Sequence, residues 1–230
     1  PDLLEIARKN ASFVLENLQR DGVLLRSWKD GDARIAGFLE DYALLVDGLL
    51  ALYRATLEAR WLDEALRLTE GMIGRFASAE NAGFFDAAED HATPITRSRD
   101  LHDGATPSGN AVAADVLLHL GAMTGNDAWT ARATALLQAL ASTMRDHPLA
   151  AGRYLSALSF YLGPVQELAL AGARGGQHVV EAGGAHAVVI HQRGRGVHDL
   201  CARTLTARGR WERARRAGRS QCGHPTRPAE

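Results

Sequence analysis

The sequence predicts an all-α fold, an arc of an α/α toroid built from about three helical hairpins. Apolar residues recur at helical spacing over most of residues 2–162, and the helices that they mark are of two alternating kinds. An inner and an outer ring require this alternation, because inner helices are surrounded whereas outer helices touch solvent on one side. Nearly continuous apolar helices are expected at 38–57, 107–124 and 148–162, and one-faced amphipathic helices at 2–20, 61–77 and 127–146.

Each amphipathic helix is identified by a single apolar stripe. In the first, the stripe consists of Leu3, Ala7, Ala11, Val14 and Leu18. In the second it contains Leu62, Ala65, Leu66, Met72, Ile73 and Phe76, and in the third Trp129, Ala133, Leu136, Leu137, Leu140 and Met144. Asn126 and Asp127 can cap the third, and Gly163–Pro164 is a strong stop signal after the last apolar helix.

The helix at 107–124 is expected to be buried on nearly all sides. Pro107 suits its first turn, and Thr106 is expected to cap it. Asn110 lies on a face that is otherwise apolar, so its amide needs a partner or a ligand. The alternative is that Asn110 and Ser108 satisfy backbone groups at the start of the helix.

Two long connections, 21–37 and 79–105, contain turn residues and short β-like runs at Val23–Arg26 and Gly83–Phe85. Both lead to the N-terminal end of an inner helix, so they should lie at the same end of the assembly. Long ordered loops in a compact domain are often functional, which directs the search for a site to this end.

The formal charge of −1 conceals two differently composed segments. From residue 174 onward the chain has eleven arginines, no lysine and four acidic residues, a charge of +7, whereas residues 1–173 carry −8. Residues 1–173 are therefore expected to form the helical arc, and 174–230 an irregular tail rich in Arg and Gly.

Three interpretations of the 174–230 tail compete: a nucleic-acid-binding arm, a disordered extension, and translation in a shifted frame after about residue 173. The shifted frame is favoured, because GC-rich DNA read out of frame yields many Arg and Gly residues without Lys. Nucleic acid is not expected as a partner, since Trp211 is the one aromatic residue of the tail.

Several classes of function are excluded by sequence features that are missing. No run approaches the roughly 18 apolar residues of a membrane span, and no basic-then-apolar leader opens the chain, so we expect a cytoplasmic location and no membrane partner. Cys201 and Cys222 have no CxxC spacing. There is no phosphate-binding G-x-x-x-x-G-K-[ST] sequence, no nucleophile elbow and no metal-ligand spacing among the histidines, so neither a cofactor nor a metal is expected.

Four motifs occur in the order Gly37–Ala43, Gly83–Asp86, Arg97–Asp103 and Asp103–Asn110. Their order and spacing resemble the C-terminal half of the thioredoxin-domain-containing proteins, the bacterial relatives of spermatogenesis-associated protein 20. The resemblance covers about residues 1–171. It implies the last half of an (α/α)6 toroid similar to N-acylglucosamine 2-epimerases and six-hairpin glycosidases. The missing N-terminal half-toroid and a thioredoxin-like domain are then the expected partners of this fragment.

Asp41 and Asp103 are the leading candidates for catalysis, together with Glu40. Asp41 lies apart from the polar stripe of its helix, and a half-buried carboxylate has a raised pKa unless it is hydrogen-bonded, which suits a general acid or base. Asp103, with Asp100 beside it, precedes the helix at 107–124, so it would face Asp41 across one cavity. Paired carboxylates of this kind hydrolyse glycosides. The alternative is that Glu40 and Asp41 favour the positive end of the helix dipole.

Five further residues are predicted to bind a sugar-like substrate: Tyr42, Phe84, Arg97, Ser108 and Asn110. Phe84 would stack on a sugar ring, although aromatic residues in such turns are more often plugs of the core. Arg97 would hold or neutralise a carboxylate, the alternative being a loop salt bridge that contributes little.

Two functions follow. The first is a fragment of a carbohydrate-active toroid, glycosidase- or epimerase-like, that is inactive by itself; the second is a non-catalytic helical scaffold or partner-binding module. An enzyme should bring Asp41, Tyr42, Asp103 and Asn110 into one pocket, whereas a scaffold should use them in helix caps and salt bridges.

Overall fold

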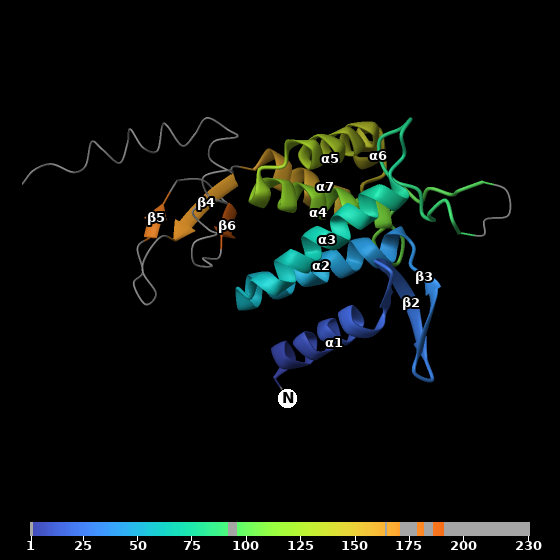
Figure 1. The fold of residues 1–230 in the computed structure, drawn as a ribbon. Coiled ribbons are helices and arrows are strands. Elements are labelled where there is room, and N and C mark those ends of the chain that lie inside the picture. The colour runs from blue at the N-terminus through green and yellow to red at the C-terminus, as the bar shows by residue number, and fades with distance from the viewer. Residues whose placement is uncertain (1, 92–95, 164, 171–178, 182–185, 191–230) are drawn as a thin grey trace, which may run out of the picture.

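The computed structural model describes residues 2–91, 96–163, 165–170, 179–181 and 186–190, and helices make up most of them (Figure 1), as the all-α prediction requires. The helices are α1 Leu3–Asn17, α2 Leu39–Thr56, α3 Ala59–Phe76, α4 Gly109–Thr124, α5 Asp127–Ala139, α6 Ala141–Asp146 and α7 Gly152–Leu162. A single 3-10 turn, Pro148–Ala150, precedes α7.

Two small sheets accompany the helices. The first, antiparallel in the order β1-β2-β3, consists of β1 Gln19–Arg20, β2 Val23–Lys29 and β3 Asp32–Ala36. The second has the order β5-β4-β6, with β4 Val165–Leu170, β5 Val179–Glu181 and β6 His186–Ile190. β5 and β6 belong to the 174–230 tail, but most of that tail lies outside the described residues, so its predicted character stays a prediction.

The structure corrects three details of the predicted helices. α4 begins at Gly109, where Ser108 is the N-cap and its Oγ accepts a hydrogen bond from the Ala111 amide at 3.1 Å; the expectation that Thr106 caps this helix is wrong. Ser108 holds this position because its backbone is extended and its hydroxyl is within reach of the first turn. The 127–146 segment is interrupted at Leu140 into α5 and α6, and the 148–162 segment becomes helical only from Gly152.

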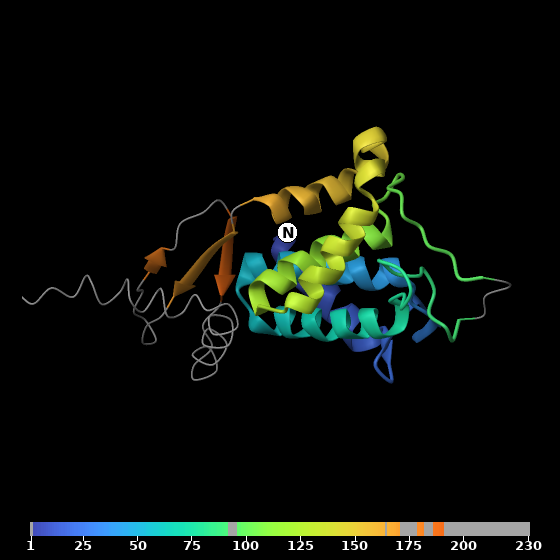
Figure 2. The same ribbon diagram turned by 90° about the horizontal axis from the view of Figure 1, so that it is seen from above.

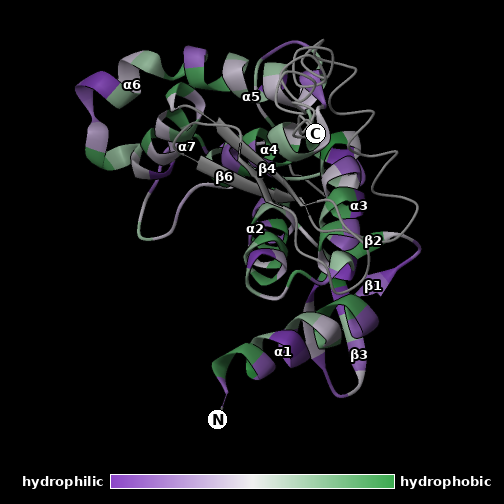
Figure 3. Ribbon diagram, turned by 90° about the vertical axis from the view of Figure 1, so that its left-hand side faces the viewer, coloured by the Kyte–Doolittle hydropathy of each residue, from purple (hydrophilic) through white to green (hydrophobic). Residues whose placement is uncertain are grey.

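The helices form two layers that correspond to the predicted inner and outer positions. α4 packs between α2 and α7, while α3 covers α2 and α5 covers α4. Nearly all residues of α4 are buried, whereas α3 buries one stripe, and hydrophobic and hydrophilic residues alternate along α1 and α3 in Figure 3. The two layers are compatible with an arc of a toroid, and the toroid itself stays a prediction.

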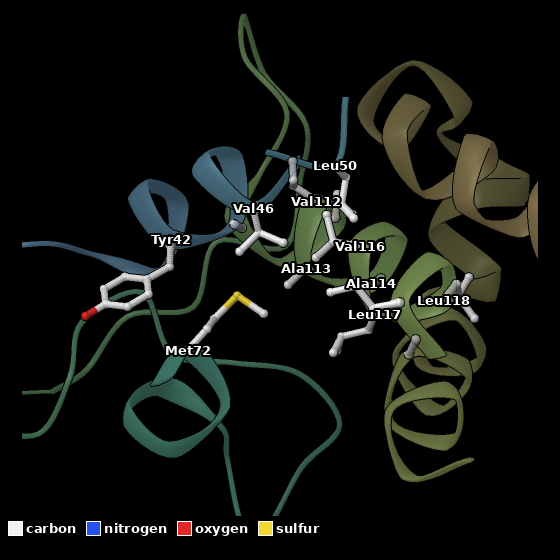
Figure 4. Close-up of a cluster of buried hydrophobic side chains, with 14 of the residues drawn as sticks. Tyr42, Val46, Leu50, Met72, Val112, Ala113, Ala114, Val116, Leu117 and Leu118 are labelled. Carbon is white, nitrogen blue, oxygen red and sulfur yellow. The ribbon is translucent and has the colours of Figure 1, made fainter. Parts of the chain in front are cut away.

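One hydrophobic core joins the two layers. Figure 4 shows Val46 of α2, Met72 of α3 and Val116 of α4 in a single cluster, and all three side chains are wholly buried. The backbones of α2 and α4 approach closely at Gly109, where an added Cβ would lie 3.0 Å from the Glu40 backbone nitrogen. The N-terminal ends of the two inner helices therefore meet directly.

An ion-pair network connects the three inner helices. The Arg153 guanidinium of α7 lies 2.9 Å from Asp47 Oδ2 on α2 and donates to Asp115 Oδ2 on α4 at 2.6 Å. Asp115 is 7% exposed on an otherwise apolar helix. Burial raises the pKa of its carboxyl above the ordinary value of 3.8, against the opposing attraction of Arg153.

The raised pKa of Asp115 predicts a specific dependence of stability on pH. The folded chain holds this proton more tightly than the unfolded chain, so the contribution of Asp115 to the free energy of unfolding is largest below pH 3.8 and is lost as pH rises through the raised pKa. Asp115→Asn should remove this fall. Urea unfolding of the parent chain and of Asp115→Asn, from below about pH 4 to about pH 7, measures how the free energy of unfolding of each depends on pH. Asp30→Asn, at an exposed turn, is the matched control, and an unchanged slope in Asp115→Asn would contradict the prediction.

Candidate functional site

A cavity of about 320 Å³ lies where the N-terminal ends of α2 and α4 meet β2 and the loop between α3 and α4. Figure 1 places β2, β3 and this loop at one end of the helices, and Figure 2 shows the loop extending beyond that end. The two long connections thus share one end of the molecule, as the sequence predicts. The polar side chains that line the cavity are Arg26, Glu40, Asp86, Asp100, His102, Thr106 and Ser108.

Backbone hydrogen bonds fix the loop at the rim of the cavity. The Leu39 amide donates to the Asp86 carbonyl at 2.8 Å, which joins the loop to the start of α2. The Asp86 amide donates in turn to the Ser98 carbonyl at 2.9 Å. Loop and helix therefore form one continuous wall.

The acidic side of the cavity consists of linked carboxylates. Both Asp86 oxygens accept from the Asp100 amide, each at 2.9 Å, and Asp100 Oδ1 accepts from the His102 amide at 3.2 Å. Each carboxylate oxygen has further lone pairs, so these bonds leave acceptor capacity on both residues.

Arg26 is the cationic group of the cavity. Its guanidinium donates to Glu40 Oε1 at 3.1 Å, lies 3.6 Å from Asp41 Oδ2, and stacks 4.8 Å from the centroid of the Phe38 ring. β2 thereby contributes a hydrogen-bond donor to the cavity that the carboxylates of the loop also line.

Asp41 and Asp103 both bind backbone amides. Asp41 Oδ2 accepts from the Phe38 amide at 2.8 Å in the first turn of α2. Asp103 uses one oxygen for the Ser108 amide at 2.9 Å and the other for the Arg153 amide at 2.7 Å, so it joins the starts of α4 and α7. Neither lines the cavity, and their catalytic roles stay predictions.

Asn110 finds its partners in the loop. Its Oδ1 accepts from the Phe84 amide at 2.8 Å, and its Nδ2 donates to the carbonyls of Phe84 and Asp100 at 3.0 and 3.1 Å. The side chain is wholly buried. The expected need for a partner is therefore met by protein backbone, and Asn110 holds the loop that carries Asp86 and Asp100.

The remaining predicted binding residues have structural contacts. Tyr42 is wholly buried, and its hydroxyl accepts from the Leu24 amide at 2.8 Å. Phe84 is also wholly buried, as the core-plug alternative requires. Arg97 donates to the Ala87 carbonyl at 2.8 Å and stacks 4.1 Å from the Phe85 ring centroid. Their binding roles stay predictions.

Glu40 and Ser108 are the two predicted site residues that line the cavity. Sequence reasoning did not select Arg26, Asp86 or His102 as site residues, although Asp86 ends the Gly83–Asp86 motif. The sequence feature that could have led to these three residues is the position of both long loops before the N-terminal ends of inner helices. Which of their side chains faces inward depends on loop geometry that periodicity does not describe.

Neither a metal-binding group of side chains nor a membrane-spanning helix is found in the described part of the chain. No group of three or more His, Cys, Asp or Glu residues there is placed to hold a metal ion. Among the same residues, no helix has both the length and the apolar character needed to cross a membrane.

Comparison with known proteins shows homology to spermatogenesis-associated protein 20. The human protein is 40% identical over 139 residues and the rat protein 38% identical over 137 residues. These alignments cover 60% and 59% of this chain, but only 18% and 17% of the relatives. An uncharacterized protein of Caenorhabditis elegans is 25% identical over 163 residues, which are 67% of this chain and 22% of that protein. No protein-family model matches the chain.

The clamp formed by Asn110 predicts a large loss of stability on its removal. Asn110→Ala leaves the buried amide and carbonyl of Phe84 without their partners, and we expect a loss of about 2–4 kcal/mol in the free energy of unfolding. Urea denaturation measures this loss. Asn10→Ala, at an exposed position of α1, is the control and should change stability little. A loss in Asn110→Ala no larger than in this control would show that the loop is held by other contacts.

Proposed function

We propose that this chain is a segment of a larger protein whose α/α toroid is carbohydrate-active, glycosidase- or epimerase-like, and that the polar cavity binds a sugar-like substrate. The observation that carries the proposal is the grouping of three carboxylates, Glu40, Asp86 and Asp100, with the Arg26 guanidinium around one cavity.

The chemistry of these groups suits a polyhydroxy ligand. Each hydroxyl is both a donor and an acceptor, so it can donate to a carboxylate while it accepts from Arg26. Charge-assisted hydrogen bonds of this kind are stronger than neutral ones. Two or more carboxylates at one cavity also supply the acid and the base that glycoside hydrolysis needs.

The position of the cavity supports the toroid as its setting. The cavity lies at the N-terminal ends of two adjacent inner-layer helices, α2 and α4, which meet at Gly109. The human relative is much longer than the aligned segment. In the larger protein that we propose, regions corresponding to the unaligned parts of this relative would form the rest of the ring and a thioredoxin-like domain. We expect the chain by itself to bind ligand weakly and to be inactive.

Binding of simple sugars tests this proposal. A panel of hexoses and N-acetylhexosamines is titrated into the chain and followed by NMR. At least one sugar should bind. Glu40→Gln should lower the affinity for this sugar by about tenfold, because a charged acceptor at the cavity is lost. Glu70→Gln, at an exposed position of α3, should leave the affinity unchanged. Equal affinities in the two variants, or no binding by any sugar, would rule out the cavity as the proposed site.

A second function, a non-catalytic helical scaffold or partner-binding module, is favoured by a separate observation. Asp41, Tyr42, Asp103 and Asn110 all have hydrogen bonds to backbone, which is the arrangement expected of a scaffold. Large apolar side chains are also exposed on α1 and α7: Leu3 is 79% exposed and Leu162 72%. These helices are the edges on which we propose that the missing half-toroid packs.

The exposed edges predict self-association of the chain. Apolar surface contributes about 25 cal/mol for each Å² removed from water, so contact between such edges is favourable. Light scattering should detect oligomers, and the double variant Leu3→Glu/Ile6→Glu should reduce them, because Ile6 is also 49% exposed. Asn10→Glu adds charge to an exposed polar position of the same helix and is the control. A monomeric parent chain with one sharp unfolding transition would contradict both the open edges and the half-toroid.

A further inference from the structure

One exposed face of α2 leads away from the cavity. Glu40, Leu44 and Asp47 are spaced by four and three residues, so they lie on the same side of the helix. Glu40 lines the cavity, and Leu44 is 44% exposed. Asp47 follows Glu40 by seven residues, which is about 10 Å along the helix axis.

At Asp47 this face meets the ion-pair network of the inner helices. Arg153 lies 2.9 Å from Asp47 and 2.6 Å from Asp115, and His119 Nε2 lies 3.7 Å from the other oxygen of Asp115. The Asp47 side chain keeps 31% of its surface exposed and that of Arg153 25%. The buried Nε of Arg153 has no hydrogen-bond partner among the described atoms. The network thus presents the Asp47 carboxylate as an acceptor at the surface, beside the partly exposed side chain of Arg153.

The charges of the network favour a neutral ligand. Arg153 is paired with both Asp47 and Asp115, and Arg54 also acts electrostatically on Asp115, so charges of both signs lie together and neither a phosphate nor a cation meets a surface of one opposite sign. A hydroxyl group can donate to the exposed carboxylate of Asp47 without the cost of burying a new charge. Leu44, between the two polar ends, offers an apolar contact for the carbon face of a ring.

We infer that Asp47 and Arg153, backed by Asp115, form a second subsite about 10 Å from the cavity, and that the ligand is a neutral polyhydroxy chain of at least two sugar units. This inference rests on the proposed function, because it takes the cavity as the first subsite. It adds the length of the substrate, which the cavity alone does not set.

A length series tests the second subsite. Glucose, maltose and maltotriose, and the β-linked series of the same lengths, are titrated into the full chain by calorimetry. In one of the two series, affinity should rise by about tenfold from the single unit to the two- or three-unit ligand, as added charge-assisted hydrogen bonds predict. Asp47→Asn, which keeps the shape of the side chain, should bring the ratio of these affinities close to one.

Two controls separate the possible outcomes. Glu70→Gln, on the exposed side of α3, should keep the affinity ratio of the parent chain, and Glu40→Gln should weaken every member of the series. If the single unit binds but affinity does not rise with length, or if Asp47→Asn keeps the rise, the network serves only to connect the helices and the inference is wrong. If no sugar binds to the parent chain, the proposed function itself fails. Thermal unfolding of Asp47→Asn verifies that the variant is folded.

Discussion

The buried amide of Asn110 is the contact on which the geometry of the site depends. A loop of more than thirty residues leaves α3 and returns at α4, and a segment of that length has little regular structure to hold it. Asn110 substitutes for a neighbouring strand: it accepts from the amide and donates to the carbonyl of Phe84 while Phe84 fills the core. Asp86 follows two residues later, so this clamp and the backbone hydrogen bond from Leu39 to Asp86 together place it at the cavity.

Close contact of the inner helices is the second constraint. α4 consists largely of small and branched apolar residues, and Gly109 brings its first turn against the first turn of α2. Any side chain at this position would have to displace the Glu40 backbone. The polar rim of the cavity is therefore assembled on two helix ends whose separation is fixed by packing.

The helices could be predicted from the sequence because apolar periodicity is a local property, and the alternation of fully apolar and one-faced segments also indicated the layers. The end of the molecule that carries the cavity followed from loop placement. The roles of single polar residues could not be predicted from the sequence in this way. Asp41 and Asp103 have the residue type and position of catalytic acids, yet their oxygens bind backbone amides that only the folded chain brings near. Asp86 and Arg26 were missed for the same reason, since their side chains meet through tertiary contacts.

The two oxygens of Asp103 also have a mechanical consequence. One carboxylate holds amide groups at the starts of both α4 and α7, and these starts lie more than forty residues apart along the chain. Ser108 belongs to the rim of the cavity and Arg153 to the first turn of α7, the helix that precedes β4. The rim of the cavity and the start of the last described helix thus depend on the same side chain, and loss of the Asp103 carboxylate would release both at once.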